Sequence, residues 1–165
     1  MSHHKKGDLI VNIYTSRYAN PELKSGDYIT VSISTGFPKF RTGYTINLQI
    51  KEITPYGVFG VYKEYEDYKR EYFKRLDSFG VPAIQRHFDI MQRCYEQDIV
   101  LLCFEDIRKG GDNWCHRTMF AEWWLSKTGQ VIEELSDPTP YKTDKPKHKI
   151  IHDLTDNSEQ FKFQF

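Results

Sequence analysis

The sequence has no excess of either charge. Its 165 residues include 23 Lys and Arg and 23 Asp and Glu, so the formal net charge at pH 7 is zero. A protein without net charge has no global field that attracts nucleic acid or anionic membranes. A nucleic-acid partner is therefore unsupported by charge, and only a local patch could bind one.

Long apolar runs are also missing. The opening residues, MSHHKK, lack the apolar core of a signal peptide. No stretch approaches the roughly 20 apolar residues of a membrane span. The three cysteines are an odd number, so we expect free thiols in a reducing cytoplasm rather than a disulfide framework.

The chain is long enough for one domain, because a protein of this size buries roughly 70% of its unfolded surface without help from disulfides or metal. We expect an N-terminal extension at residues 1–8, an α/β domain at residues 9–135 and a polar C-terminal tail at residues 136–165. The end of that tail, residues 161–165, alternates like an edge strand.

The pattern of apolar residues predicts strands and helices in mixed order. Strands are expected at residues 9–14, 28–34, 99–104 and 131–135, with a weaker strand pattern at 44–50. Helices are expected at 63–78, 82–96 and 115–126, the last capped by Asp112 or Asn113 and ended by Gly129. This order favours a single-domain, three-layer α/β sandwich with a largely parallel, Rossmann-like sheet.

Polar residues gather where the predicted strands end. Ligands of open α/β sheets bind at the carboxyl ends of the strands. We therefore expect ligand-binding residues at these ends and at the start of the third helix, namely Thr15, Ser16, Arg17, Ser34, Cys103, Glu105 and Arg117.

The third predicted helix begins at Cys115, His116 and Arg117. A thiol at a helix N-terminus beside His and Arg has a lowered pKa and is reactive, and an imidazole can act as acid or base. Cys115 and His116 are therefore the candidate catalytic residues. The alternatives are a small buried thiol that packs under a turn and an imidazole that caps backbone groups.

Arg117 requires an explanation of its own. A cation in the first turn of a helix opposes the helix dipole, at a cost of ~0.3–1 kcal/mol. Either an ion pair with Glu105 offsets this cost, or a bound anion does, shared between the guanidinium and free backbone N–H groups. Both explanations stay open at the level of sequence.

Other chemistries fit less well. The Cys-five-residues-Arg loop of cysteine phosphatases is absent, because Cys115 and Arg117 are two residues apart. Zinc could bind Cys103, Cys115 and His116, although adjacent ligands are awkward, and a Cys103–Cys115 disulfide is not expected in a cytoplasmic chain. The tyrosines of residues 62–73 indicate either core or a stacking wall for a base.

Several segments together resemble a known family. They are Ile13-Tyr-Thr-Ser16, Val31-Ser-Ile-Ser34 with Pro38, the Tyr-rich helix at residues 64–72 and, most specifically, Val100-Leu-Leu-Cys-Phe-Glu105 followed by Cys115-His-Arg117. Over residues 9–135 the chain resembles the domain-of-unknown-function family 488 (DUF488). The resemblance implies a compact α/β fold from bacteria, archaea or their phages, and it implies no particular activity or cofactor.

We expect a domain that binds a small anionic ligand, a nucleotide or phosphate-bearing metabolite, at the carboxyl edge of the sheet, with thiol and imidazole chemistry at Cys115 and His116. The alternative is a non-enzymatic interaction protein, a phage or mobile-element factor that binds a host protein or nucleic acid, in which the Cys-His-Arg cluster is structural. A metal-binding module is the third hypothesis.

Overall fold

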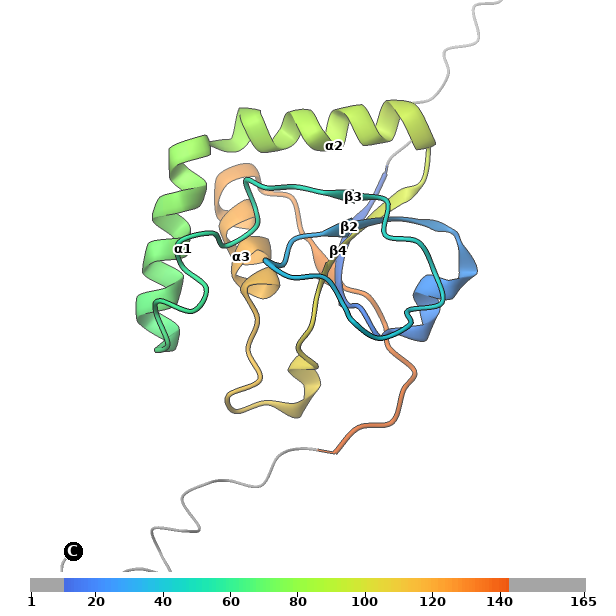
Figure 1. Ribbon diagram of the computed structural model, residues 1–165. Helices are drawn as coiled ribbons and strands as arrows, with labels where there is room; N and C mark the ends of the chain where they lie inside the picture. The colour runs from blue at the N-terminus through green and yellow to red at the C-terminus, as the bar shows by residue number, and fades with distance from the viewer. Residues whose placement is uncertain (1–10, 143–165) are drawn as a thin grey trace, which may run out of the picture.

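The computed structural model describes residues 11–142, so the edge strand predicted at 161–165 lies outside the described part of the chain. Five parallel strands form one sheet in the order β3-β2-β4-β1-β5. They are β1 (Ile13–Arg17), β2 (Tyr28–Ser32), β3 (Leu48–Gln49), β4 (Asp98–Cys103) and β5 (Glu133–Glu134). The predicted parallel α/β sheet is confirmed (Figure 1).

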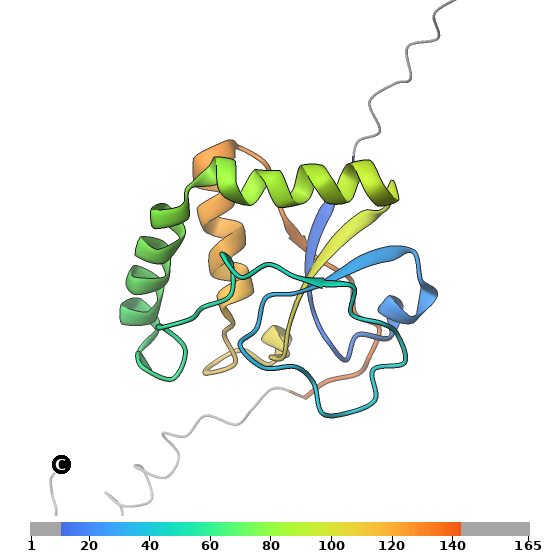
Figure 2. The ribbon, with the colours of Figure 1, turned by 45° about the horizontal axis from the view of Figure 1, so that its top comes forward.

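The two faces of the sheet are covered differently. One face carries the helices α1 (Tyr65–Phe79), α2 (Val81–Tyr95) and α3 (His116–Thr128). The other face carries the 3-10 helix η1 (Pro21–Ser25) and parts of the segments that follow β2 and β5. The third layer of the sandwich is therefore thin and contains no α-helix among the described residues (Figures 1 and 2).

The alternation of β4 shows how this sandwich follows from the sequence. Ile99 and Leu101 lie in the large core under the helices, whereas Val100 and Leu102 lie in the smaller core on the opposite face. A strand that is apolar on both faces must be covered on both. β4 is the central strand, with β2 on one side and β1 on the other.

The connections of the sheet all have the same hand. The chain passes from β1 to β2 and from β2 to β3 in one direction along the sheet, over the face that carries η1. It returns from β3 to β4 and from β4 to β5 in the opposite direction, over the helical face. Such consistency is expected of parallel crossovers, and it places the carboxyl ends of β1, β4 and β2 at a point where ligands of α/β proteins bind.

The helices form as their apolar spacing predicts. Tyr68, Tyr72 and Leu76 bury one side of α1, and Trp123 and Trp124 of α3 are almost completely buried, so these aromatics are mainly core. α3 ends at Gly129, as predicted, where a φ of 76° favours glycine. No helix of residues 11–142 is both long and apolar enough to cross a bilayer.

The start of α3 differs from the prediction. Neither Asp112 nor Asn113 caps the helix: the N-cap residue is Cys115, which has an extended backbone and makes no side-chain capping bond. The side chain of Asn113 donates to the carbonyl of Gly110 instead, which keeps it within the preceding loop. The chain therefore switches from extended to helical between Cys115 and His116.

Two strand predictions also need correction. β1 continues through Thr15, Ser16 and Arg17, which were expected to follow it, because its backbone pairs with β4 on one side and β5 on the other. β3 covers only two residues of the predicted 44–50, since the side chain of Asn47 accepts from the backbone N–H of Thr30 at 2.9 Å in place of a backbone partner.

Candidate functional site

A cavity of about 480 Å³ opens at the carboxyl edge of the sheet. It lies between the end of β4, the start of α3, the start of α1 and the loops after β2 and β3. Its walls are largely aromatic and include Phe59, Tyr62, Tyr68, Phe104 and Trp114. The rings of Tyr68 and Trp114 meet edge to face, with 5.0 Å between their centroids.

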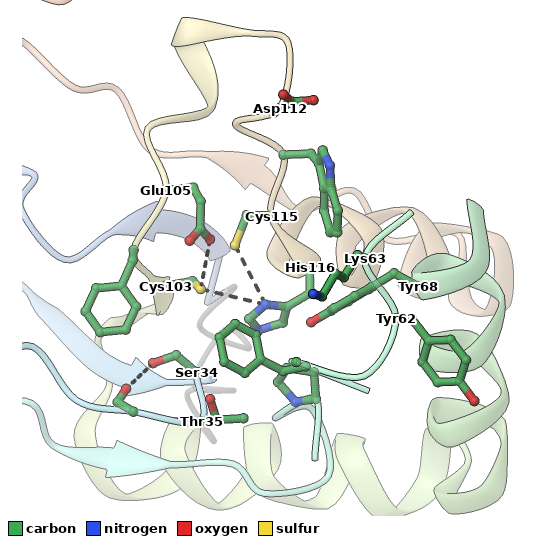
Figure 3. Close-up of a pocket in the computed structure, with 16 residues that line it drawn as sticks. Ser34, Thr35, Tyr62, Lys63, Tyr68, Cys103, Glu105, Asp112, Cys115 and His116 are labelled. Atoms are coloured by element: carbon green, nitrogen blue, oxygen red, sulfur yellow. Dashed lines mark hydrogen bonds between the residues drawn. The ribbon is translucent and has the colours of Figure 1, made fainter. Parts of the chain in front are cut away.

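Three side chains that can bind metal or act as nucleophiles meet at the buried end of this cavity (Figure 3). The Nδ1 atom of His116 lies 3.7 Å from the Sγ atom of Cys103 and 3.7 Å from that of Cys115. All three line the cavity, although each side chain is buried. We call Cys103, Cys115 and His116 the Cys-His cluster.

The fold explains why these residues converge. Cys103 is the last residue of β4 and shares the helical face with Ile99 and Leu101, two and four positions earlier. The extended backbone of Cys115 and the helical backbone of His116 let two adjacent side chains approach one centre. The spacing that made adjacent ligands awkward in the sequence is thus resolved by the turn into α3.

A backbone carbonyl orients the imidazole. The Nε2–H of His116 donates to the carbonyl oxygen of Ile33 at 2.6 Å, just after β2. The ring therefore directs its Nδ1 atom at both sulfurs (Figure 3). As a cation it donates a hydrogen bond to a thiolate, and as a neutral ring it offers a lone pair there.

The two thiols of the cluster have opposite acidities. Burial raises the pKa of Cys115, but the hydrogen bond from Cys103 and the influence of His116 and Arg117 outweigh it, so the pKa of Cys115 lies well below its usual value. The same hydrogen bond, together with burial, raises the pKa of Cys103 well above its usual value. Cys115 is the thiolate of the pair, and Cys103 keeps its proton, which both the Sγ atom of Cys115 and, at 3.5 Å, the Oε1 atom of Glu105 can accept.

Glu105 completes the polar end of the cavity. Its Oε1 atom lies 3.5 Å from the Sγ atom of Cys103. Burial, followed by the negative charge of Cys115, raises the pKa of the Glu105 carboxyl to about 7. A carboxyl group with such a pKa can exchange protons near neutral pH.

Arg117 lies beneath this site and does not line the cavity. Its side chain is fully buried and binds Glu134 through two hydrogen bonds of 3.0 and 2.8 Å. Of the two explanations that the sequence left open, an ion pair with the Glu105 carboxylate is wrong: Glu105 contributes its backbone carbonyl, at 2.7 Å. The partner comes from β5, whose contact with α3 could not be read from local sequence.

The polar residues of β1 hold neighbouring segments in place and do not line the cavity. Thr15 donates to Glu134 at 2.7 Å and so holds the partner of Arg117. Ser16 accepts from Asn20, and Arg17 binds Asp137 at 2.6 Å. None of the three predicted site residues Thr15, Ser16 and Arg17 lines the cavity, because β1 extends through them and their side chains bond to β5, to Asn20 and to the segment after β5.

Ser34 does line the cavity, as expected from its place after β2. Its hydroxyl donates to the carbonyl of Gly36 at 2.6 Å and shares a hydrogen bond with the hydroxyl of Tyr18 at 2.6 Å. The structure thus brings together Ser34, Cys103, Glu105, Cys115 and His116 from the predicted set.

Sequence reasoning missed much of the cavity wall. Phe59 comes from the irregular segment after β3, and Trp114 comes from the loop before α3. Neither segment has a periodic pattern that fixes side-chain direction. Lys63 was expected to begin a helix, but α1 starts only at Tyr65, so Lys63 lies in the preceding segment. For Tyr62 and Tyr68 a stacking wall was one of two interpretations: both line the cavity, and Tyr68 is also buried.

The atoms of the cluster are also spaced as metal ligands. The two Sγ atoms and a ring nitrogen of His116 all lie within 4.8 Å of one another. Thiolate and imidazole are the ligands that zinc prefers. The arrangement can therefore act as a thiol-imidazole pair or hold a metal ion.

Comparison with protein-family models, with curated proteins and with solved structures found no match for this chain, so the resemblance to DUF488 stays an expectation drawn from its motifs.

Proposed function

We propose that this protein binds a small molecule with a planar ring and an anionic group in the cavity, and that the Cys-His cluster supplies the chemistry at the ligand's reactive atom. Nucleotides and other phosphate-bearing ring compounds are the ligand class. The observation that carries the proposal is the convergence of Cys103, Cys115 and His116 at the buried end of a 480 Å³ cavity.

The walls support a planar ring. Sites for small molecules are concave and mainly apolar, with a few polar groups that fix orientation. Tyr68 and Trp114 offer aromatic surface inside this cavity, and Phe59 and Phe104 are partly exposed at its wall. Rings of this kind bind heterocycles by stacking, which contributes ~1–3 kcal/mol per base.

The anionic group requires a cation, and Arg117 is not available for it. Lys63 is the cationic side chain that lines the cavity, and it is exposed. We assign the anion to Lys63, with Thr35 as a hydroxyl donor that also lines the cavity. The sequence predicted an anion site at Arg117. We propose Lys63 in its place, a residue that was not among the predicted site residues.

Thermal shift measurements test this proposal with a matched pair of ligands and a matched pair of variants. A nucleoside monophosphate should raise the melting temperature of the wild type more than the corresponding nucleoside does, because at equal concentration the ligand with the lower Kd stabilises the folded state more. Lys63→Ala should reduce the response to the nucleotide to that of the nucleoside. Lys51→Ala, an exposed lysine outside the cavity, should leave both responses unchanged.

Two results would overturn the proposal. The absence of any response of the wild type across a panel of nucleotides and phosphorylated ring metabolites would remove the ligand class. An equal nucleotide response in Lys63→Ala and Lys51→Ala would remove the assigned anion site.

A further inference from the structure

We propose that the Cys-His cluster binds one zinc ion through Cys103 Sγ, Cys115 Sγ and His116 Nδ1, with the fourth coordination position facing the cavity. This inference deepens the proposed function, on which it rests for the role of the ion. The bound ligand would meet the metal at the buried end of the cavity.

The separations of the ligand atoms suit zinc. In a tetrahedral site, Zn–S bonds of about 2.3 Å and Zn–N bonds of about 2.0 Å place sulfur and nitrogen about 3.5 Å apart. The two S···N distances here are both 3.7 Å. All three atoms lie within 4.8 Å of one another, so the two sulfurs, which stand about 3.8 Å apart in a tetrahedral site, would need to approach by at most about 1 Å.

The imidazole is oriented as zinc ligands are. A metal-bound His usually donates its second ring N–H to a carbonyl or carboxylate, which fixes the tautomer and the ring direction. His116 does so to the carbonyl of Ile33 at 2.6 Å, and its Nδ1 atom faces both sulfurs. Nε2 is therefore occupied by the hydrogen bond to the backbone, and Nδ1 is free to coordinate the ion.

A buried cation lies next to the cluster. Arg117 follows His116 directly in α3, and its Nη1 atom is buried without a hydrogen-bond partner among the described residues. Two thiolates balance the charge of Zn²⁺, so binding of the ion displaces the protons of both Cys103 and Cys115.

Three coordinating side chains with an open position are typical of catalytic rather than structural zinc. In this fold the open position faces an aromatic cavity. An ion there would polarise an oxygen or nitrogen of the ligand as a Lewis acid. Glu105, beside Cys103, would lie next to that reacting atom.

Zinc affinity, measured by competition with a chromophoric chelator, tests the assignment against controls within the same chain. The wild type should bind about one equivalent. Cys103→Ser, Cys115→Ser and His116→Asn should each lower the affinity at least tenfold, a loss in keeping with removal of a ligand. Cys94→Ser and His87→Asn change an exposed cysteine and a surface histidine bound to Glu52, and both should retain wild-type affinity.

A second measurement needs no variant and so does not depend on variants that fail to fold. Cobalt substituted into the wild type should show thiolate-to-cobalt charge transfer and the visible bands of a tetrahedral site. Wild type that binds no stoichiometric zinc, or cobalt without thiolate bands, would overturn the metal assignment. Equal affinities of Cys94→Ser and Cys115→Ser would do so as well.

Failure of the zinc proposal can be distinguished from failure of the proposed ligand class. The nucleotide thermal shifts are repeated in the presence of a chelator and in the presence of zinc. Loss of zinc binding with a retained, Lys63-dependent nucleotide response removes only the metal. Stoichiometric zinc without any nucleotide response removes the ligand class and leaves the metal site.

Discussion

At the scale of single residues, the Arg117–Glu134 ion pair is the feature of the site whose formation has the largest free-energy cost to offset. A cation in the first turn of a helix is unfavourable, and full burial adds a desolvation cost. Two hydrogen bonds to Glu134 and one to the carbonyl of Glu105 offset both costs. Arg117 therefore supports the floor of the site and joins α3 to β5.

Removal of this guanidinium should be strongly destabilising. Arg117→Ala should lower the free energy of unfolding by about 2–5 kcal/mol, because it leaves a cavity in place of a fully buried side chain and removes the partner of the partly exposed Glu134. Urea unfolding measures the loss. Arg70→Ala is the control: it breaks an exposed ion pair with Asp67, which contributes little to stability because solvent screens it. Equal losses in the two variants would contradict a structural role for Arg117.

The sequence was sufficient to place some residues of the site and insufficient for others, and the difference has a physical reason. Cys103, Glu105, Cys115 and His116 could be placed because each follows or opens an element whose end is marked by local pattern. The partner of Arg117 could not, since Glu134 is joined to it only through the pairing of β5 with β1.

At the scale of elements, glycines end helices where the chain turns. Gly129 has a φ of 76° and no atom within 4 Å of the position of an added Cβ, so a side chain there would meet backbone strain and no clash. Gly129→Ala should therefore cost about 1 kcal/mol in the free energy of unfolding.

Gly36 is the matched control for this substitution, because it also has open space around it and no positive φ. Gly36→Ala should change the free energy of unfolding by no more than about 0.5 kcal/mol. Chemical denaturation of both variants measures the difference. A loss at Gly36 as large as that at Gly129 would contradict the assignment of strain to the helix end.

Hydrogen bonds and a cation–π contact of Arg108 connect the loop after β4 with the segment after β5. Arg108 forms a two-bond pair with Asp106 and also donates to the carbonyls of Asp137 and Thr139. The ring of Tyr141 lies 4.4 Å from the same guanidinium. Residues 136–142, expected to belong to a polar tail, are therefore tied to the domain.

This network gives a pH dependence with a defined sign. The hydrogen bonds from Arg108 lower the pKa of Asp106 to about 2. Because the folded-state pKa is depressed, the stabilisation is present above the unfolded value near 4 and is lost as the pH falls towards 2. Its size is on the order of 1 kcal/mol after screening by solvent.

Urea unfolding of the wild type and Asp106→Asn at several pH values measures this contribution. The gap in stability between the two proteins should be constant above pH 5 and should close as the pH falls to about 2. Asp67→Asn, a change at an exposed carboxylate, should give little gap at any pH. A gap for Asp106→Asn that widens on acidification would contradict the assigned pairing.

At the scale of the whole molecule, the site follows from topology. The position of β4 between β1 and β2 brings Cys103 beside the segment that follows β2, where Ile33 orients His116. The sequence was sufficient to predict the parallel sheet and the edge at which the cluster lies. It was insufficient for the thin third layer and for much of the aromatic wall, because Phe59 and Trp114 come from segments without periodicity.

The most direct test of the account is the rate at which each cysteine of the wild type is alkylated by a small neutral reagent, resolved by mass spectrometry in the presence of a chelator. The cavity should admit the reagent to Cys115, whose lowered pKa favours the reactive thiolate form. Cys115 should then react faster than Cys94, although Cys94 is exposed and Cys115 is buried. Rapid reaction at Cys94 with no reaction at Cys115 would contradict the account.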